Sequence, residues 1–273
     1  MIRSPVKGGC EIRIGTSGWH YKHWRGPFYP ADLPSSRMLP FYLNYFDTVE
    51  INNSFYHLPL ANTFRNWRRQ AAPGVRFAVK GSRYLTHMKK LKDPEAGLRR
   101  FFALVDLLGT KLGPVLFQLP PHWGCNASRL AEFLRALPRR HRYSFELRDP
   151  SWHVPEIYDL LARHNAAFCI YELAGFRSPI RLTADFAYVR LHGPGQKAYQ
   201  GSYDRATLRR WRDRIRRWQS DLKAVYVYFD NDQRGYAAAN ALTLRRYLCD
   251  ISEVENNLKA NTLTSRKQLS LSY

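Results

Sequence analysis

The chain contains eight short apolar runs, separated by segments that are mostly long enough to form a helix. Strands that alternate with helices favour a parallel sheet, and eight such units close into a (β/α)₈ barrel. We therefore predict an α/β fold, a single TIM-type barrel with parallel strands. The strands are expected at 11–16, 47–52, 75–80, 114–119, 143–148, 166–172, 186–192 and 224–230.

The segments between these runs carry apolar residues at helical spacing and helix-ending signals. Helices are expected at 40–45, 61–72, 95–112, 127–137, 155–164, 204–221 and 236–249. The sixth connection, from Glu172 to Asp185, is short and is expected to hold only a helical turn. We place the barrel domain at residues 1–250 and expect residues 251–273 to form a polar C-terminal tail.

The length of 273 residues suits one barrel, since this fold typically needs about 250. The N-terminus lacks the apolar core of a signal peptide, and no run approaches the roughly 18 apolar residues of a membrane span. The four cysteines lack the spacing of a zinc site or a disulfide framework. We therefore expect a cytoplasmic protein with reduced thiols and no membrane partner.

The net charge of +21 indicates a polyanionic partner if the basic residues gather on one surface. In the segment 208–222, however, apolar residues recur at helical spacing and arginines occupy the other positions. Such a pattern is typical of an outer helix with a solvated face. Because similar basic runs fall on other predicted helices, we favour a general electrostatic field, and nucleic acid remains an alternative partner.

Polar residues end nearly every apolar run. In the segment 48–52, side chains at 48, 50 and 52 share one face, and the apolar pair between them faces the helices. The same alternation places a set of polar side chains inside the barrel at the strand ends. This set is Glu50, Asn52, Lys80, Glu146, Arg148, Arg190, His192, Tyr228 and Asp230. Buried charges are costly unless they are paired, so the set indicates a function or a mutual network.

Several sequence blocks occur in an order typical of a known family. The first is IGTSGWHYKHWRGPFYP at 14–30, and the others include TVEIN at 48–52, FAVK at 77–80, FQLPP at 117–121, ELR at 146–148, VRLHG at 189–193 and VYFDND at 227–232. Over residues 12 to 248 the chain resembles the YecE-like family, domain of unknown function 72 (DUF72). The resemblance implies a TIM-like barrel and no settled activity. Similar proteins usually carry Asn where this chain has Asp230.

Four residues at the strand ends are the catalytic candidates: Glu50, Lys80, Glu146 and His192. A desolvated lysine can act as a nucleophile or base, and a buried carboxyl group can be tuned as an acid. The alternative is a buried ion-pair lattice that also includes Arg148 and Arg190. The position at the carboxyl ends of barrel strands favours function for the set.

A metal site would have to draw on Glu50, Glu146, His192 and Asp232. Zinc catalysis usually uses two or three histidines, and of the histidines only His192 ends a strand. We therefore assign no metal ligands, and a divalent metal is the less favoured option. The chain also lacks a P-loop and a G-x-G-x-x-G fingerprint, so no nucleotide cofactor motif is present.

Other rim residues are candidates for substrate binding because they can stack, donate hydrogen bonds or neutralise an anion. They are Trp19, Asn52, Tyr56, Gln118, Arg148, Trp152, Arg190, Tyr228, Asn231 and Asp232. The glycine-rich segment 192–197 and the segment 233–235 follow the last two strands, where barrels often hold a phosphate group. Arg190, Lys197 and Arg234 would supply positive charge there.

These observations favour an enzyme, a hydrolase or a lyase, that acts on an anionic phosphorylated or carbohydrate-type substrate. The first alternative is a protein that binds nucleic acid or processes phosphodiesters with the same basic pocket. The second is a barrel that binds a ligand without turning it over. Fold alone does not decide among them, since this barrel hosts many chemistries.

Overall fold

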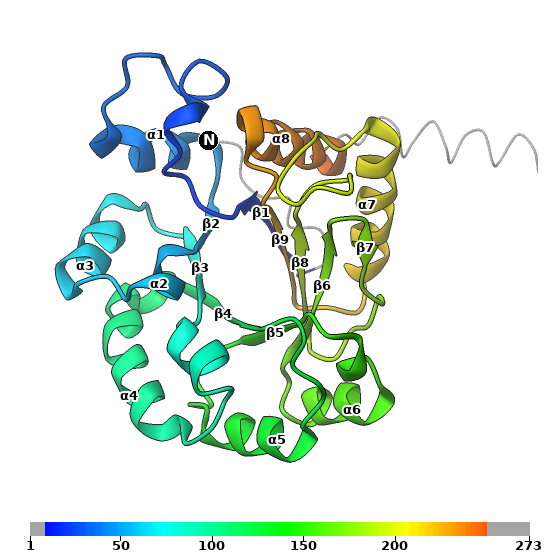
Figure 1. The fold of residues 1–273 in the computed structure, drawn as a ribbon. Coiled ribbons are helices and arrows are strands. Elements are labelled where there is room, and N and C mark those ends of the chain that lie inside the picture. The colour runs from blue at the N-terminus through cyan, green and yellow to red at the C-terminus, as the bar shows by residue number, and fades with distance from the viewer. Residues whose placement is uncertain (1–8, 250–273) are drawn as a thin grey trace, which may run out of the picture.

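The computed structural model describes residues 9–249, and Figure 1 shows a ring of strands with helices around it. Eight parallel strands form a nearly closed (β/α)₈ barrel, which confirms the predicted fold class. A ninth strand, β7, pairs antiparallel with β6. The strands are β1 (Glu11–Thr16), β2 (Thr48–Ile51), β3 (Arg76–Lys80), β4 (Leu112–Leu119), β5 (Tyr143–Leu147), β6 (Ala167–Leu173), β7 (Phe176–Arg177), β8 (Phe186–Leu191) and β9 (Ala224–Phe229).

The strand order around the barrel is β1-β9-β8-β6-β5-β4-β3-β2. β1 and β2 meet through a parallel bridge between Ser17 and Glu50, and the Gly18 N–H donates to the Glu50 carbonyl oxygen at 2.8 Å. Gly15 makes this approach possible, because a Cβ atom there would lie 2.3 Å from the Thr48 carbonyl oxygen. The barrel therefore closes near the carboxyl ends of β1 and β2.

Helices surround the strands (Figure 1) and bury their apolar sides against them. They are α1 (Met38–Tyr45), α2 (Asn53–Tyr56), α3 (Ala61–Gln70), α4 (Pro94–Val105), α5 (Ala127–Ala136), α6 (Pro155–Arg163), α7 (Arg205–Trp218) and α8 (Tyr236–Cys249). In α7, Leu208, Trp211 and Ile215 are buried, as the predicted amphipathic pattern requires. Most arginines of α7 lie on its outer side.

Two sequence predictions were wrong in detail. The sixth connection holds no helical turn, because Ala174 and Gly175 both have positive φ and form a two-residue hairpin turn between β6 and β7. The helix expected to reach Leu112 ends at Val105 instead, and a 3₁₀ segment interrupted at Gly109 leads into β4. Neither of the two segments contributes a side chain to the polar strand ends.

The barrel interior below the polar strand ends is filled by aromatic and small side chains. Buried interior residues are Ala78, Leu116, Ala167, Cys169, Tyr171, Phe186, Tyr188, Ala224, Tyr226 and Tyr228. The interior is therefore a packed core that supports the polar side chains above it. Within residues 9–249, none of the helices is both long and apolar enough to cross a membrane. The predicted tail at 251–273 lies outside the described residues.

Candidate functional site

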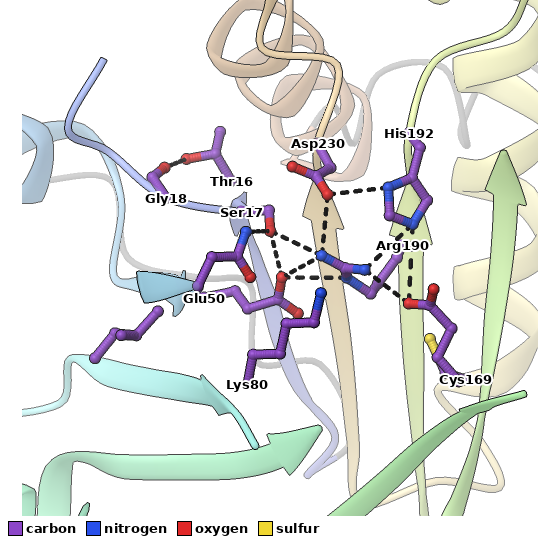
Figure 2. Close-up of polar contacts among 12 residues, drawn as sticks. Thr16, Ser17, Gly18, Glu50, Lys80, Cys169, Arg190, His192 and Asp230 are labelled. Atoms are coloured by element: carbon purple, nitrogen blue, oxygen red, sulfur yellow. Dashed lines mark hydrogen bonds and ion pairs between the residues drawn. The ribbon is translucent and has the colours of Figure 1, made fainter. Parts of the chain in front are cut away.

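Charged and polar side chains gather where β1, β2, β5, β8 and β9 end, and Figure 2 shows Arg190 at their centre. We call this set the rim cluster: Ser17, Glu50, Glu146, Arg190, His192 and Asp230. All six are buried. They come together because their side chains are on the interior face of their strands or directly follow a strand end.

The Arg190 guanidinium binds three carboxylates. Its Nη2 donates to Glu50 Oε1 at 2.8 Å and to Asp230 Oδ2 at 3.0 Å, and its Nη1 donates to Glu146 Oε2 at 2.7 Å. Nη2 also lies 3.0 Å from the Ser17 hydroxyl oxygen, which it donates to. Because Arg190 is buried and these acceptors surround it, its charge is already neutralised within the protein.

Two carboxylates of the cluster, on Glu146 and Asp230, are held in their charged forms. Burial alone would raise the pKa of Glu146, but Arg148 and Arg190 hold it well below its usual value. Burial likewise opposes ionisation of Asp230, and Arg190 and His192 nevertheless lower its pKa. Glu146 and Asp230 therefore serve as fixed negative charges beside Arg190. The third carboxylate, on Glu50, accepts a further hydrogen bond from the Tyr188 hydroxyl, which lies 2.5 Å from Glu50 Oε2.

His192 lies between two of these carboxylates. Its Nδ1 is 2.9 Å from Asp230 Oδ2, and its Nε2 is 3.8 Å from Glu146 Oε2 and 3.3 Å from Arg190 Nη1. The ring is fully buried and packs edge-on against Tyr199, with ring centroids 5.5 Å apart. Asp230, which the resemblance singled out as unusual, therefore provides the acidic partner of both His192 and Arg190.

Lys80 differs from Arg190 and Arg148 because it has no carboxylate partner in the described part of the chain. Figure 2 shows its side chain extending from the end of β3 toward Arg190 and Glu50. Its Nζ lies 4.2 Å from the Phe55 ring centroid, and no carboxylate among the described residues forms an ion pair with it. Burial, reinforced by Arg190, lowers the pKa of Lys80 from 10.5 to about 8. A substantial fraction of this amine is therefore neutral near physiological pH.

His87 is a neighbour of this amine that sequence reasoning missed. It packs edge-on against the Phe55 ring at 5.0 Å, so both His87 and Lys80 contact the same aromatic side chain. Burial, together with the charge of Lys80, lowers the pKa of His87 to about 4. His87 lies in a single π-helical turn after β3, where strand alternation gives no signal. Its imidazole is neutral at pH 7 and adds no charge near Lys80.

Arg148 is the more accessible guanidinium of the site. Its Nε donates to Glu146 Oε1 at 2.6 Å, and its side chain is 15% exposed, compared with 1% for Arg190. Gln118, the candidate on β4, is buried, and its Nε2 donates to the Leu119 carbonyl oxygen at 3.1 Å. Of the two arginines, Arg148 is therefore the one placed to meet a bound anion.

A cavity of about 530 Å³ lies among the segments that follow β1 and β2 and the helices α1 and α3, and no residue of the rim cluster lines it. Trp19 and Asn52 both line it. The Asn52 Nδ2 donates to the Ser17 hydroxyl at 2.5 Å, and Ser17 in turn donates to Glu50. The buried Asn52 Oδ1 has no hydrogen-bond partner among residues 9–249. Asn52 thus connects the cavity to the rim cluster through its hydrogen bond to Ser17.

The remaining candidates lie outside the rim cluster. Trp152 is fully buried and its indole N–H donates to the Trp123 carbonyl oxygen at 2.6 Å. Tyr228 is buried below the cluster, 2.7 Å from the Thr48 hydroxyl. Asn231 is buried as well and donates to Gly201 and Asn240. These three side chains are therefore buried and hydrogen-bonded within the protein.

Two further candidates are at the periphery. Tyr56 is 69% exposed at the end of α2. Asp232 is half-buried, and its carboxylate lies 3.2 Å from His23 Nε2. Lys197 and Arg234, predicted to attract a phosphate, are both exposed on their loops. Within the part of the chain that the structure describes, no three His, Cys, Asp or Glu side chains are grouped as metal ligands.

Fold and site together define the class of protein: a TIM-type barrel with a polar cluster at the carboxyl ends of its strands, the end at which enzymes of this fold act. The model of the family described as "Protein of unknown function DUF72" matches residues 13–263, so this chain belongs to the DUF72 family. The resemblance found in the sequence is confirmed.

Relatives and solved structures agree with this assignment. The UPF0759 protein YunF of Bacillus subtilis is 26% identical, over 84% of this chain and 92% of YunF. The UPF0759 protein YecE of Escherichia coli is 29% identical over about half of each chain. The crystal structure of a DUF72 family protein from Thermotoga maritima covers 87% of this chain and 99% of its own, with 28% identity and a TM-score of 0.80. A DUF72 family protein from Enterococcus faecalis (18% identity, TM-score 0.76, 87% of this chain and 95% of its own) shares the fold.

Proposed function

We propose that this protein is an enzyme that acts on a small anionic substrate, with Lys80 as its catalytic amine. The observation that carries the proposal is the contrast between Lys80 and Arg190 within one buried site. Arg190 is held by three carboxylates, whereas Lys80 has no carboxylate partner among the described residues and its pKa is near 8. A lysine in a purely structural lattice would be paired and fully charged.

The other residues take supporting roles in this proposal. Glu50, Glu146 and Arg190 position one another, and their fixed charges set the potential at Lys80. Arg148 binds the anionic group of the substrate, because its guanidinium is partly exposed. Trp19 and Asn52 line the adjacent cavity and contact the part of the substrate that does not react. His192, held near Asp230, remains the candidate acid or base of the cluster.

A thermal-shift screen tests this proposal. Phosphorylated sugars, neutral sugars and short oligonucleotides would be added at low and moderate salt. At 100 times its Kd a ligand raises the apparent stability by about 2.7 kcal/mol, which such a screen detects. We expect a small phosphate ester to stabilise the protein at both salt concentrations. Arg148→Gln should remove the shift, and Arg209→Gln on the outer face of α7 should retain it.

Two results would contradict the proposal in different ways. Stabilisation by oligonucleotides alone, lost as salt rises, would indicate a nucleic-acid-binding protein, because contacts to many phosphates are strongly salt-dependent. A ligand that binds equally well to wild type and Lys80→Met, with no chemical change in either, would indicate a barrel that binds without catalysis.

A further inference from the structure

We propose that Lys80 forms an imine with the carbonyl group of its substrate, which is a small aldehyde or ketone that also carries an anionic group. This inference rests on the proposed function and names its chemistry. Lysine amines form Schiff bases with carbonyl compounds when they are desolvated or lie beside another cationic group. Lys80 meets both conditions, since it is buried at the end of β3 beside Arg148 and Arg190.

The surroundings of Nζ favour a nucleophilic amine over an ion-paired one. One side of Nζ faces the Phe55 ring at 4.2 Å, and that ring also contacts the uncharged His87. On the cluster side, Glu146 and Glu50 already accept hydrogen bonds from other residues, chiefly the arginines. Among the described residues, none forms a hydrogen bond with Nζ, so the lone pair of the neutral amine is available to attack a carbonyl carbon.

The charges of the cluster suit an iminium ion. Three carboxylates, on Glu50, Glu146 and Asp230, face two guanidinium groups, on Arg148 and Arg190. When Lys80 is neutral, these five groups carry one net negative charge. A cation at the Lys80 nitrogen brings this sum to zero, so an iminium formed there is not an uncompensated charge. Burial is the main reason that the pKa of the free amine is nevertheless low.

The step balances without a cofactor. The lone pair of Nζ attacks the carbonyl carbon, a C–N bond forms, and the π electrons of the C=O bond move to the oxygen. The nitrogen then loses a proton and the oxygen gains one, which gives a neutral carbinolamine. The C–O bond then breaks, the oxygen leaves as water after a second protonation, and a protonated C=N bond remains. Protons are exchanged with solvent water. The iminium can then accept the electron pair of a neighbouring C–H or C–C bond, which is the chemistry of a lyase.

Reductive trapping with a matched pair of aldehydes tests the inference. Glycolaldehyde phosphate and neutral glycolaldehyde would each be added with cyanoborohydride at pH 7.5, and labelled lysines mapped by mass spectrometry. With a pKa of about 8, Lys80 holds roughly 200-fold more free amine at this pH than a lysine at 10.5. We therefore expect a single main adduct on Lys80 that forms faster with the phosphate. Lys80→Arg should abolish it, and Lys223→Arg, at the opposite end of the barrel, should not.

The outcomes separate this inference from the proposed function. Arg148→Gln should slow labelling by glycolaldehyde phosphate more than labelling by neutral glycolaldehyde, so that the ratio of the two rates falls toward one. Labelling spread over exposed lysines without Lys80 overturns the imine. If a phosphate ester stabilises wild type but not Arg148→Gln, and Lys80 is never trapped, the imine fails and the proposed function stands. If there is neither stabilisation nor an adduct, both proposals fail.

Discussion

Replacing Lys80 with Met should stabilise the protein, although the substitution removes a buried charged side chain. Burial and the neighbouring Arg190 lower the pKa of Lys80 from 10.5 to about 8, a difference of about 2.5 units. Each unit corresponds to 1.36 kcal/mol, so holding the charged form in the folded protein costs about 3 kcal/mol. Methionine removes that cost, and its flexible side chain can still pack against Phe55.

The stability gained by Lys80→Met should decrease as the pH rises. Because the folded-state pKa is lower than that of the unfolded chain, the unfolded chain binds more protons between pH 8 and 10.5. The cost of Lys80 is therefore complete below pH 8 and declines as the pH rises to 10.5. The charged or titratable groups around Nζ are Arg148, Arg190, Glu50, Glu146, Asp230 and His87. We expect Lys80→Met to gain up to about 3 kcal/mol at pH 7 and less than about 1 kcal/mol at pH 10.

Urea unfolding followed by tryptophan fluorescence, at pH 7 and pH 10, measures both values. Lys80→Gln provides a second variant that removes the charge with a different side chain. If both variants are less stable than wild type at pH 7, Lys80 is a required partner of the carboxylates. That result would show that Lys80 stabilises a structural ion-pair lattice.

Other substitutions should behave differently. Arg190→Met leaves three carboxylates without their shared cation, so the free energy of unfolding in the same assay should fall by about 3–5 kcal/mol. Unchanged stability would show that the carboxylates form other ion pairs. Because the pKa of His87 is about 4 in the folded protein and 6.5 in the unfolded chain, wild type should lose stability as the pH falls from 6.5 to 4. His87→Gln should reduce this loss in urea titrations. An equal loss of stability in wild type and variant would contradict the burial of His87. Gly15→Ala should lower the free energy of unfolding by about 1–3 kcal/mol and lower the Tm, because the added Cβ atom would lie 2.3 Å from the Thr48 carbonyl oxygen. An unchanged Tm would mean that β1 and β2 separate easily.

The positions of the strands could be predicted because the core of a parallel barrel demands apolar runs of strand length, and nearly every one of these runs ends in polar residues. Alternation within those runs was enough to place Glu50, Lys80 and Glu146 on the interior face. It could not show which of these charges are paired. That property depends on the approach of β2, β5 and β8 across the barrel, which brings Glu50 and Glu146 to one guanidinium.

The hairpin after β6 and the positions of Trp152 and His87 could not be predicted from the sequence pattern. The hairpin after β6 requires positive φ at Ala174, a residue type that rarely adopts it, so the segment did not resemble a two-residue turn. Trp152 follows a strand end, as a pocket residue would, but it turns inward to Trp123. The position of His87 in an isolated π-helical turn could not be obtained from either helical or strand periodicity.

The most direct test of the account is the pH dependence of the reactivity of Lys80. Competitive labelling with trace acetic anhydride from pH 6 to pH 11, followed by peptide mass spectrometry, reports the ionisation of each lysine separately. We expect a midpoint near pH 8 for Lys80, well below the value of about 10.4 that is typical of an unperturbed lysine side chain. A midpoint above pH 10 for Lys80 would contradict the claim that this barrel holds a free catalytic amine.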